Sequence, residues 1–288
     1  MSIRKILLPL ASTRAGEAAL ASGLLVARIW NAHVLALHVR IDSRDVAPLA
    51  GEGLSGAMIE EMMAATEKES GERAELLRAL FDRAVAANQI SLAEPKADQN
   101  IATATFAAAV GREEDVVAQQ ARLADLTVVA HPEATQDAAA AEALHAVLFD
   151  SGRPVLLAPA TPPTDIGRRI CVAWNGTAES ASAVTAALPW LQRAGAVRIL
   201  SSEGYQRRGP PAEELAPYLA LHGVSAELAT IRPTGGTVGA DILAEAEEFG
   251  ADLVTMGAYS HSRLRQLILG GVTRYVLEHA RLPILMNR

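Results

Sequence analysis

The sequence reads Ala-Asp-Leu-Thr-Val-Val at residues 124–129 and Ala-Asp-Leu-Val-Thr-Met at residues 251–256, so one short pattern occurs twice. Two further pairs of segments repeat in the same order. Arg-Lys-Ile-Leu-Leu-Pro at 4–9 is matched by Arg-Arg-Ile-Cys-Val-Ala at 168–173, and Arg-Pro-Val-Leu-Leu at 153–157 by Leu-Pro-Ile-Leu-Met at 282–286. Three matches in one order predict a tandem duplication. We expect one domain over residues 1–160 and a second over residues 167–288, joined by a proline-rich linker.

Each half alternates short apolar runs with longer segments of helical periodicity, which is typical of a parallel sheet covered by helices. Runs such as 126–130 are apolar at nearly every position, as in strands buried on both faces. The expected strands are 4–10, 33–39, 103–109, 126–130 and 154–158 in the first half, and 169–174, 196–201, 225–231, 252–256 and 283–287 in the second. We therefore predict an α/β fold of two tandem doubly wound domains, each with a five-stranded, mainly parallel sheet.

The first half is longer than the second, and the surplus lies largely within residues 40–95. Apolar residues recur there at helical spacing, which predicts a long amphipathic helix from about residue 57 to 88. Such a helix could cover a surface of the protein or contact another molecule. Its apolar positions are Met58, Met62, Ala65, Leu76, Leu77 and Leu80.

The composition restricts the class of protein. Hydrophobic residues make up 50% of the 288, which is enough for packed cores and excludes global disorder. The net charge of −7 argues against binding nucleic acid through a broad basic face. No run reaches the roughly 18 apolar residues of a membrane-spanning helix, and the short run at 6–11 contains Pro9, so we expect a strand there and a cytoplasmic protein. The single cysteine, Cys171, excludes an intramolecular disulfide and is expected to be a buried thiol.

Residues 256–273 combine glycines with hydroxyl side chains directly after a predicted strand. They read Met-Gly-Ala-Tyr-Ser-His-Ser-Arg-Leu-Arg-Gln-Leu-Ile-Leu-Gly-Gly-Val-Thr and run into a helix that carries Val276. Glycines let backbone N–H groups approach an anion, and the amino end of a helix adds favourable partial charge. The hydroxyls of Ser260 and Thr273 can add hydrogen bonds to phosphate oxygens. The residues alone favour a phosphate-binding loop and a plain strand-to-helix turn equally.

The strand, glycine loop, helix and proline-led strand of this segment resemble the universal stress protein family, and the whole chain resembles its tandem two-domain type. Nucleotide-binding members of that family carry Gly-x2-Gly-x9-Gly-Ser/Thr after their fourth strand. Gly257 and Gly270 stand at the first and third positions, whereas Ser260 replaces the second glycine and Gly271 replaces the Ser/Thr. The resemblance implies strand order 3-2-1-4-5 in each domain and pairing of the domains through their last strands. It leaves a further homodimer of chains open.

The same resemblance implies which residues contact an adenine nucleotide. Met256 and Gly257 would lie near adenine and ribose. The triphosphate would be lined by Gly270, Gly271 and Thr273, and Ser260 would occupy a glycine position whose backbone contacts it. The family's nucleotide binders place an aspartate at the end of the first strand, and Asn175 takes that place here. An asparagine can still hydrogen-bond adenine or ribose, or it can simply cap the following helix. The expected ligand-binding set is Ala173, Trp174, Asn175, Met256, Gly257, Ser260, Gly270, Gly271, Val272 and Thr273, and no residue is assigned to catalysis or to a metal.

The corresponding positions of the first half differ. Ala11 aligns with Asn175, and the fourth strand ends in Val-Ala-His-Pro at 129–132, with no glycine until Gly152. A close-fitting backbone cradle needs glycine. We therefore expect the first domain to be a degenerate partner without a working nucleotide site.

Three functions follow from this sequence. The first is a stress-response protein whose second domain binds ATP or a related adenine nucleotide as a regulatory ligand, with Mg²⁺ only where ATP is bound. The second is slow ATP hydrolysis or autophosphorylation, for which no convincing general base or carboxylate pair stands beside the loop. The third is a nucleotide-free interaction protein, favoured by the departures from the family pattern at Asn175, Ser260 and Gly271.

Overall fold

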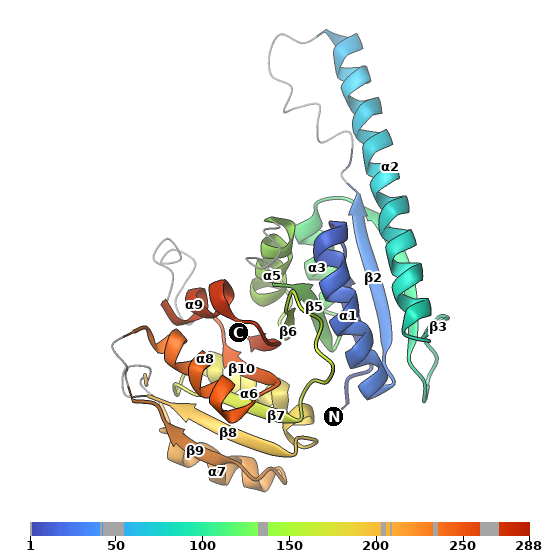
Figure 1. Cartoon of the computed structure of the whole chain (residues 1–288). Coiled ribbons are helices and arrows are strands. Elements are labelled where there is room, and N and C mark those ends of the chain that lie inside the picture. Colours follow the sequence, from blue (N-terminus) through green and yellow to red (C-terminus); the bar gives the residue numbers. More distant parts are fainter. Residues whose placement is uncertain are drawn as a thin grey trace.

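The computed structural model describes residues 2–40, 42, 55–131, 138–202, 206–207, 209–232, 236–259 and 271–288. Across these residues the strands form one continuous sheet with helices packed against it (Figure 1). The first half contains β1 (Lys5–Pro9), α1 (Thr13–Trp30), β2 (His33–Arg40), α2 (Gly56–Ala87), β3 (Ser91–Leu92), β4 (Thr103–Val110), α3 (Glu113–Ala121), β5 (Leu126–Ala130), α5 (Ala138–Asp150) and β6 (Val155–Ala158). The second contains β7 (Arg169–Ala173), α6 (Ala178–Leu191), β8 (Ala196–Ser201), α7 (Ala212–Leu221), β9 (Glu227–Thr230), α8 (Val238–Phe249), β10 (Leu253–Gly257), α9 (Gly271–His279) and β11 (Ile284–Asn287).

The order of the strands in the sheet is β3-β4-β2-β1-β5-β6-β11-β10-β7-β8-β9. In each half the five main strands therefore follow the order 3-2-1-4-5, which confirms the predicted doubly wound α/β fold. Every predicted strand is present, with ends that differ by at most two residues. The additional strand β3 was not predicted, because two exposed residues leave no burial pattern in a sequence.

The two halves meet where β6 pairs with β11. This pairing is antiparallel, with Leu156 opposite Leu285, whereas the other strand pairs of the sheet are parallel. On one face of the sheet Trp30 of α1 meets Trp190 of α6 edge to face, with ring centroids 5.4 Å apart. Buried side chains from both halves thus form one continuous apolar core across the junction.

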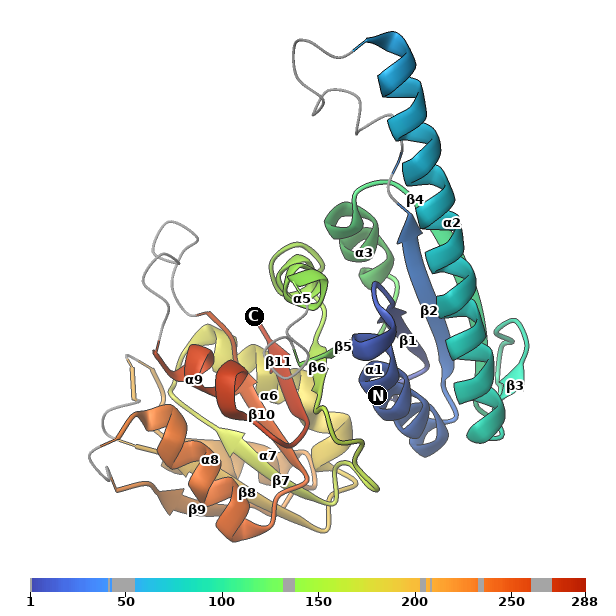
Figure 2. The ribbon, with the colours of Figure 1, turned by 45° about the horizontal axis from the view of Figure 1, so that its top comes forward.

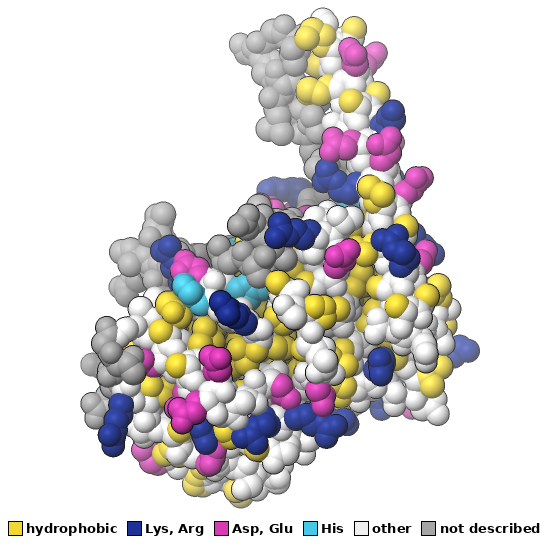
Figure 3. All heavy atoms as spheres, viewed as in Figure 1, with side chains coloured by type: hydrophobic (Ala, Val, Ile, Leu, Met, Phe, Trp, Pro, Cys, Tyr) yellow, Lys and Arg dark blue, Asp and Glu magenta, His cyan; other side chains and the backbone are white. Residues whose placement is uncertain are grey.

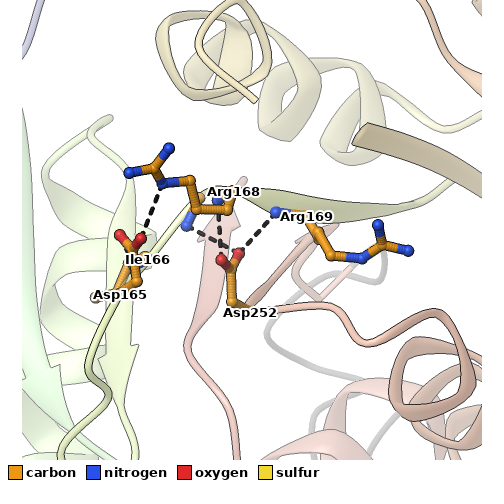
Figure 4. Close-up of polar contacts among 6 residues, drawn as sticks. Asp165, Ile166, Arg168, Arg169 and Asp252 are labelled. Atoms are coloured by element: carbon orange, nitrogen blue, oxygen red, sulfur yellow. Dashed lines mark hydrogen bonds and ion pairs between the residues drawn. The ribbon is translucent and has the colours of Figure 1, made fainter. Parts of the chain in front are cut away.

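The repeated Ala-Asp-Leu pattern has a structural cause. The carboxylate of Asp252 accepts hydrogen bonds from the backbone N–H groups of Gly167 at 2.9 Å, Arg168 at 2.9 Å and Arg169 at 3.1 Å (Figure 4). Asp125 accepts from two N–H groups at the start of β1 in the same way. The first strand of each half begins beside the fourth, and the repeated aspartate satisfies N–H groups that no neighbouring strand reaches.

Helix α2 projects beyond the body of the first half (Figures 1 and 2). Its 32 residues correspond to a length of about 48 Å. Within it Leu77, Leu80, Phe81 and Val85 are buried, so the carboxyl-terminal part packs on the body, whereas apolar side chains are visible on the projecting part (Figure 3). The predicted helix 57–88 is confirmed to within one residue. Among the described residues, none of the helices combines the length and the apolar character that crossing a bilayer requires.

Candidate functional site

The candidate site lies at the carboxyl ends of β7 and β10, which are adjacent parallel strands. Met256 pairs with Ala173, and both side chains are buried. The chain leaves β7 toward β8 on one side, while β10 lies on the other, so the strand order reverses between them. Doubly wound sheets bind their ligands at such a reversal, outside the carboxyl ends of the strands.

Asn175 stabilises the turn that connects β7 to α6. Its Oδ1 accepts hydrogen bonds from the Thr177 backbone N–H at 3.2 Å and from the Thr177 hydroxyl at 2.8 Å. Thr177 is the N-cap of α6, and its Oγ1 accepts from the Ser180 N–H. The alternative that Asn175 itself caps the helix is therefore wrong, because the polar side chain two residues later takes that place. With Oδ1 engaged in the turn, the Nδ2 amide is the part of Asn175 that can donate to a ligand.

The segment between β8 and α7 packs against the same turn. The Arg207 N–H donates to the Asn175 carbonyl at 2.8 Å, and Nε1 of Trp174 donates to the Pro210 carbonyl at 2.9 Å. Gly176 has φ +78, and a Cβ there would lie 3.0 Å from the Pro210 carbonyl oxygen. Glycine is required at this position by both its conformation and this close approach. Protein atoms thus occupy the β8 side of the turn.

Gly257 ends β10 and lies against the first turn of α6. A Cβ at this position would come within 2.6 Å of the backbone carbon of Glu179 and of the backbone nitrogen of Ser180. This packing of a helix on a strand end is a sufficient reason for glycine here. A ligand contact at Gly257 stays a prediction, and the space on its α6 side is filled by protein.

Helix α9 begins at Gly271. A Cβ at Gly271 would meet no atom of the described residues within 4 Å, so none of them blocks the amino end of this helix there. Thr273, in the first turn, is buried, and Val272 is half-buried. Two residues of the expected set, Ser260 and Gly270, lie outside the described residues. The structure brings Ala173, Trp174 and Asn175 beside Met256 and Gly257, and it starts the next helix at the glycine predicted to line a triphosphate.

The described residues at the equivalent strand ends of the first half enclose very little space. A cavity of about 10 Å³ lies at the ends of β1 and β5, lined by residues that include Pro9, Ala11, Ala15, Val129 and Ala130. Most of the lining side chains are small and apolar, and Glu113 also lines the cavity. Such a volume is about enough for one water molecule.

Residues of the first half contact the second half close to the candidate site. The Tyr259 hydroxyl lies 3.0 Å from Nε2 of His145 on α5, and Nε2 of His131 lies 3.3 Å from the Val276 carbonyl on α9. Burial raises the pKa of Tyr259 to about 12. Sequence reasoning did not identify these histidines, because their contacts depend on how the two halves meet. The tyrosine within the glycine segment was the only local signal.

Fold and site together define a doubly wound α/β protein of two similar halves, with a candidate anion-binding helix start in the second. The model of the "Universal stress protein family" matches residues 167–288. Residues 167–288 are therefore similar to the universal stress protein family, and the whole chain has the fold of its tandem two-domain type.

Solved structures of similar fold extend over the entire chain. A universal stress protein from Archaeoglobus fulgidus DSM 4304 is 16% identical with a TM-score of 0.62, and the match covers 100% of this chain and 97% of that chain. A functionally unknown protein from Pseudomonas aeruginosa PAO1 is 15% identical with a TM-score of 0.55, covering 99% of this chain and 92% of that chain. A comparison with curated proteins gave no match. At these identities the likeness to solved structures concerns the fold.

Proposed function

We propose that the chain is a cytoplasmic stress-response protein whose domain 167–288 binds ATP or a related adenine nucleotide as a regulatory ligand. The observation that carries the proposal is the course of the glycine motif. Its described ends are the end of β10, beside the end of β7, and the start of α9 at Gly271, which no described residue blocks. A helix start with accessible N–H groups and positive partial charge suits a phosphate group.

The described residues fit a nucleotide best at its phosphate end. No described residue fills the space at Gly271 where a phosphate would approach the backbone, and the Thr273 hydroxyl belongs to the same helical turn. At the nucleoside end, Asn175 offers its Nδ2 amide, which can donate to adenine or ribose, but it lacks the charge of an aspartate. We expect weaker contacts to ribose hydroxyls than an aspartate would give. Mg²⁺ would enter only together with the phosphates.

We propose domain 1–160 as a partner that carries no nucleotide of its own. The cavity of about 10 Å³ at its strand ends supports this, because an adenine nucleotide needs a pocket of several hundred Å³. The absence of glycine between residues 129 and 152 supports it as well. One nucleotide per chain is therefore the expected stoichiometry, whether chains stay single or form a homodimer.

We propose that the nucleotide is a regulatory ligand and not a substrate that the protein hydrolyses. Hydrolysis would need a carboxylate beside the loop, and two carboxylates of the second half serve the fold instead. Asp252 holds the start of β7, and Asp241 lies in the first turn of α8. A nucleotide-free interaction protein is the second candidate. It is favoured by Asn175, whose Oδ1 is engaged within its own turn.

The proposal is tested by filling the space at the start of α9. Gly271→Val places a branched side chain where the structure leaves room, so the fold is expected to remain intact while a phosphate is excluded. Gly71→Val is the matched control, because Gly71 also lies in a helix and a Cβ there also meets no atom within 4 Å. Titration with ATP should show an affinity loss of at least about tenfold, or 1.4 kcal/mol, for the first variant and none for the second. Equal ATP affinities of both variants and the unchanged chain would place the ligand elsewhere.

A further inference from the structure

Two histidines of the first half contact the second half on either side of residues 260–270. His145, on α5, contacts Tyr259, which precedes this segment by one residue. His131, at the end of β5, contacts the carbonyl of Val276 on α9, the helix that follows the segment. Residues on both sides of this segment therefore contact the first half, whose described strand ends enclose only about 10 Å³.

The contact before the segment fixes an unusual backbone conformation. Tyr259 has φ +52, a left-handed value that side chains other than glycine rarely adopt. Its ring packs against Phe149 at a centroid distance of 5.3 Å and meets the His145 ring edge to face at 5.7 Å. Its hydroxyl lies at hydrogen-bond distance from His145 Nε2. Strained conformations persist when surrounding contacts hold them, and here those contacts come from α5 of the other half.

The contact after the segment lies in the interior. His131 is 1% exposed, and its Nε2–H donates to the Val276 carbonyl, which also accepts from the Ala280 N–H at 2.9 Å. Val276 is itself fully buried. A buried hydrogen bond of this kind ties the position of α9 to the end of β5.

We propose that the first half positions the two described ends of the glycine motif in the second half, His145 acting through Tyr259 and His131 acting through Val276. The proposal rests on the proposed function for its effect on ATP affinity. His145 and His131 are positioning residues: they contact the two ends of the segment and leave the ligand to residues of the second half. ATP binding is then a property of the paired halves.

His145 offers the cleaner test, because it keeps access to solvent and its replacement leaves the core intact. His145→Leu removes the hydrogen bond to Tyr259, whereas His145→Gln retains a side-chain amide that can replace it. Glu142→Gln, at an exposed position of the same helix, is the matched control. ATP affinity should fall about three- to tenfold in His145→Leu, the factor for one ordinary hydrogen bond, and recover in His145→Gln. Tyr259→Phe should lower ATP affinity as much as His145→Leu does. The double variant should lose no more affinity than either single variant.

Amide hydrogen exchange without nucleotide supplies an independent measure. The N–H groups of residues 258–259 and 271–276 should exchange faster in His145→Leu than in the unchanged chain or in Glu142→Gln. Unchanged exchange together with unchanged ATP affinity would overturn the proposal while leaving the proposed function in place. If the unchanged chain binds no ATP, the proposed function and the affinity effect both fail, and the exchange rates then decide the positioning role alone.

Discussion

Replacing Asp252 with alanine removes the carboxylate that holds the start of β7. Three backbone N–H groups lose an acceptor at 2.9–3.1 Å. Hydrogen bonds to a charged group contribute about 1.5–3 kcal/mol each, but these groups lie near the surface, where water replaces part of the loss. We expect Asp252→Ala to lower the free energy of unfolding by about 2–4 kcal/mol. The equivalent Asp125→Ala removes two such hydrogen bonds and should lower the free energy of unfolding somewhat less.

Asp165→Ala is the control for this prediction. Asp165 forms an ion pair with Arg168 at 2.8 Å, but the two side chains are 45% and 74% exposed (Figure 4). Exposed pairs of this kind contribute at most about 1 kcal/mol. Urea unfolding followed by circular dichroism measures all three variants. A loss for Asp252→Ala no larger than that for Asp165→Ala would refute the reasoning that the repeated aspartates hold the first strands.

Further predictions concern packing, thiol chemistry and pH. Gly257→Ala should lower the free energy of unfolding by about 1–3 kcal/mol, because its Cβ would come within 2.6 Å of the α6 backbone. An unchanged midpoint of urea unfolding would mean that α6 can move away without loss of stability. Burial raises the pKa of Cys171 to about 12, so native protein at pH 8 should resist alkylation and urea-unfolded protein should react; rapid native labelling would contradict this. Desolvation lowers the pKa of His38, so the unfolded chain takes up protons first as the pH falls below about 6.5. The free energy of unfolding should therefore be highest above that pH and decrease below it. His38→Asn keeps an amide donor for the Leu10 carbonyl and should make Tm depend less on pH.

The fold was predictable because its elements carry their own signals. Strands buried on both faces leave continuous apolar runs, and α2 shows helical spacing although its amino-terminal part projects from the body (Figure 1). The repeated Ala-Asp-Leu pattern indicated the duplication, and the hydrogen bonds of Asp125 and Asp252 explain why this pattern recurs. The strand order came from family resemblance, since local periodicity does not say which strands are neighbours.

The candidate site was less predictable because its details depend on contacts between distant segments. Gly257 fits a ligand motif by sequence, yet the backbone of α6, nearly 80 positions earlier in the chain, lies directly against it. The capping role suggested for Asn175 belongs to Thr177, because the choice between two nearby polar residues depends on backbone angles. The contact of Tyr259 with His145 spans 114 positions and exists only through the pairing of the halves.

The most direct measurement is to denature the purified chain, identify any released nucleotide by mass spectrometry, and titrate the emptied chain with ATP. We predict adenine nucleotide at close to one per chain, or saturable ATP binding at that ratio. Metal-dependent formation of ADP during the titration would shift the function from a regulatory ligand to slow hydrolysis. Two nucleotides per chain would contradict the proposal that the first half carries no nucleotide of its own. Neither released nucleotide nor saturable binding would contradict the proposed function altogether.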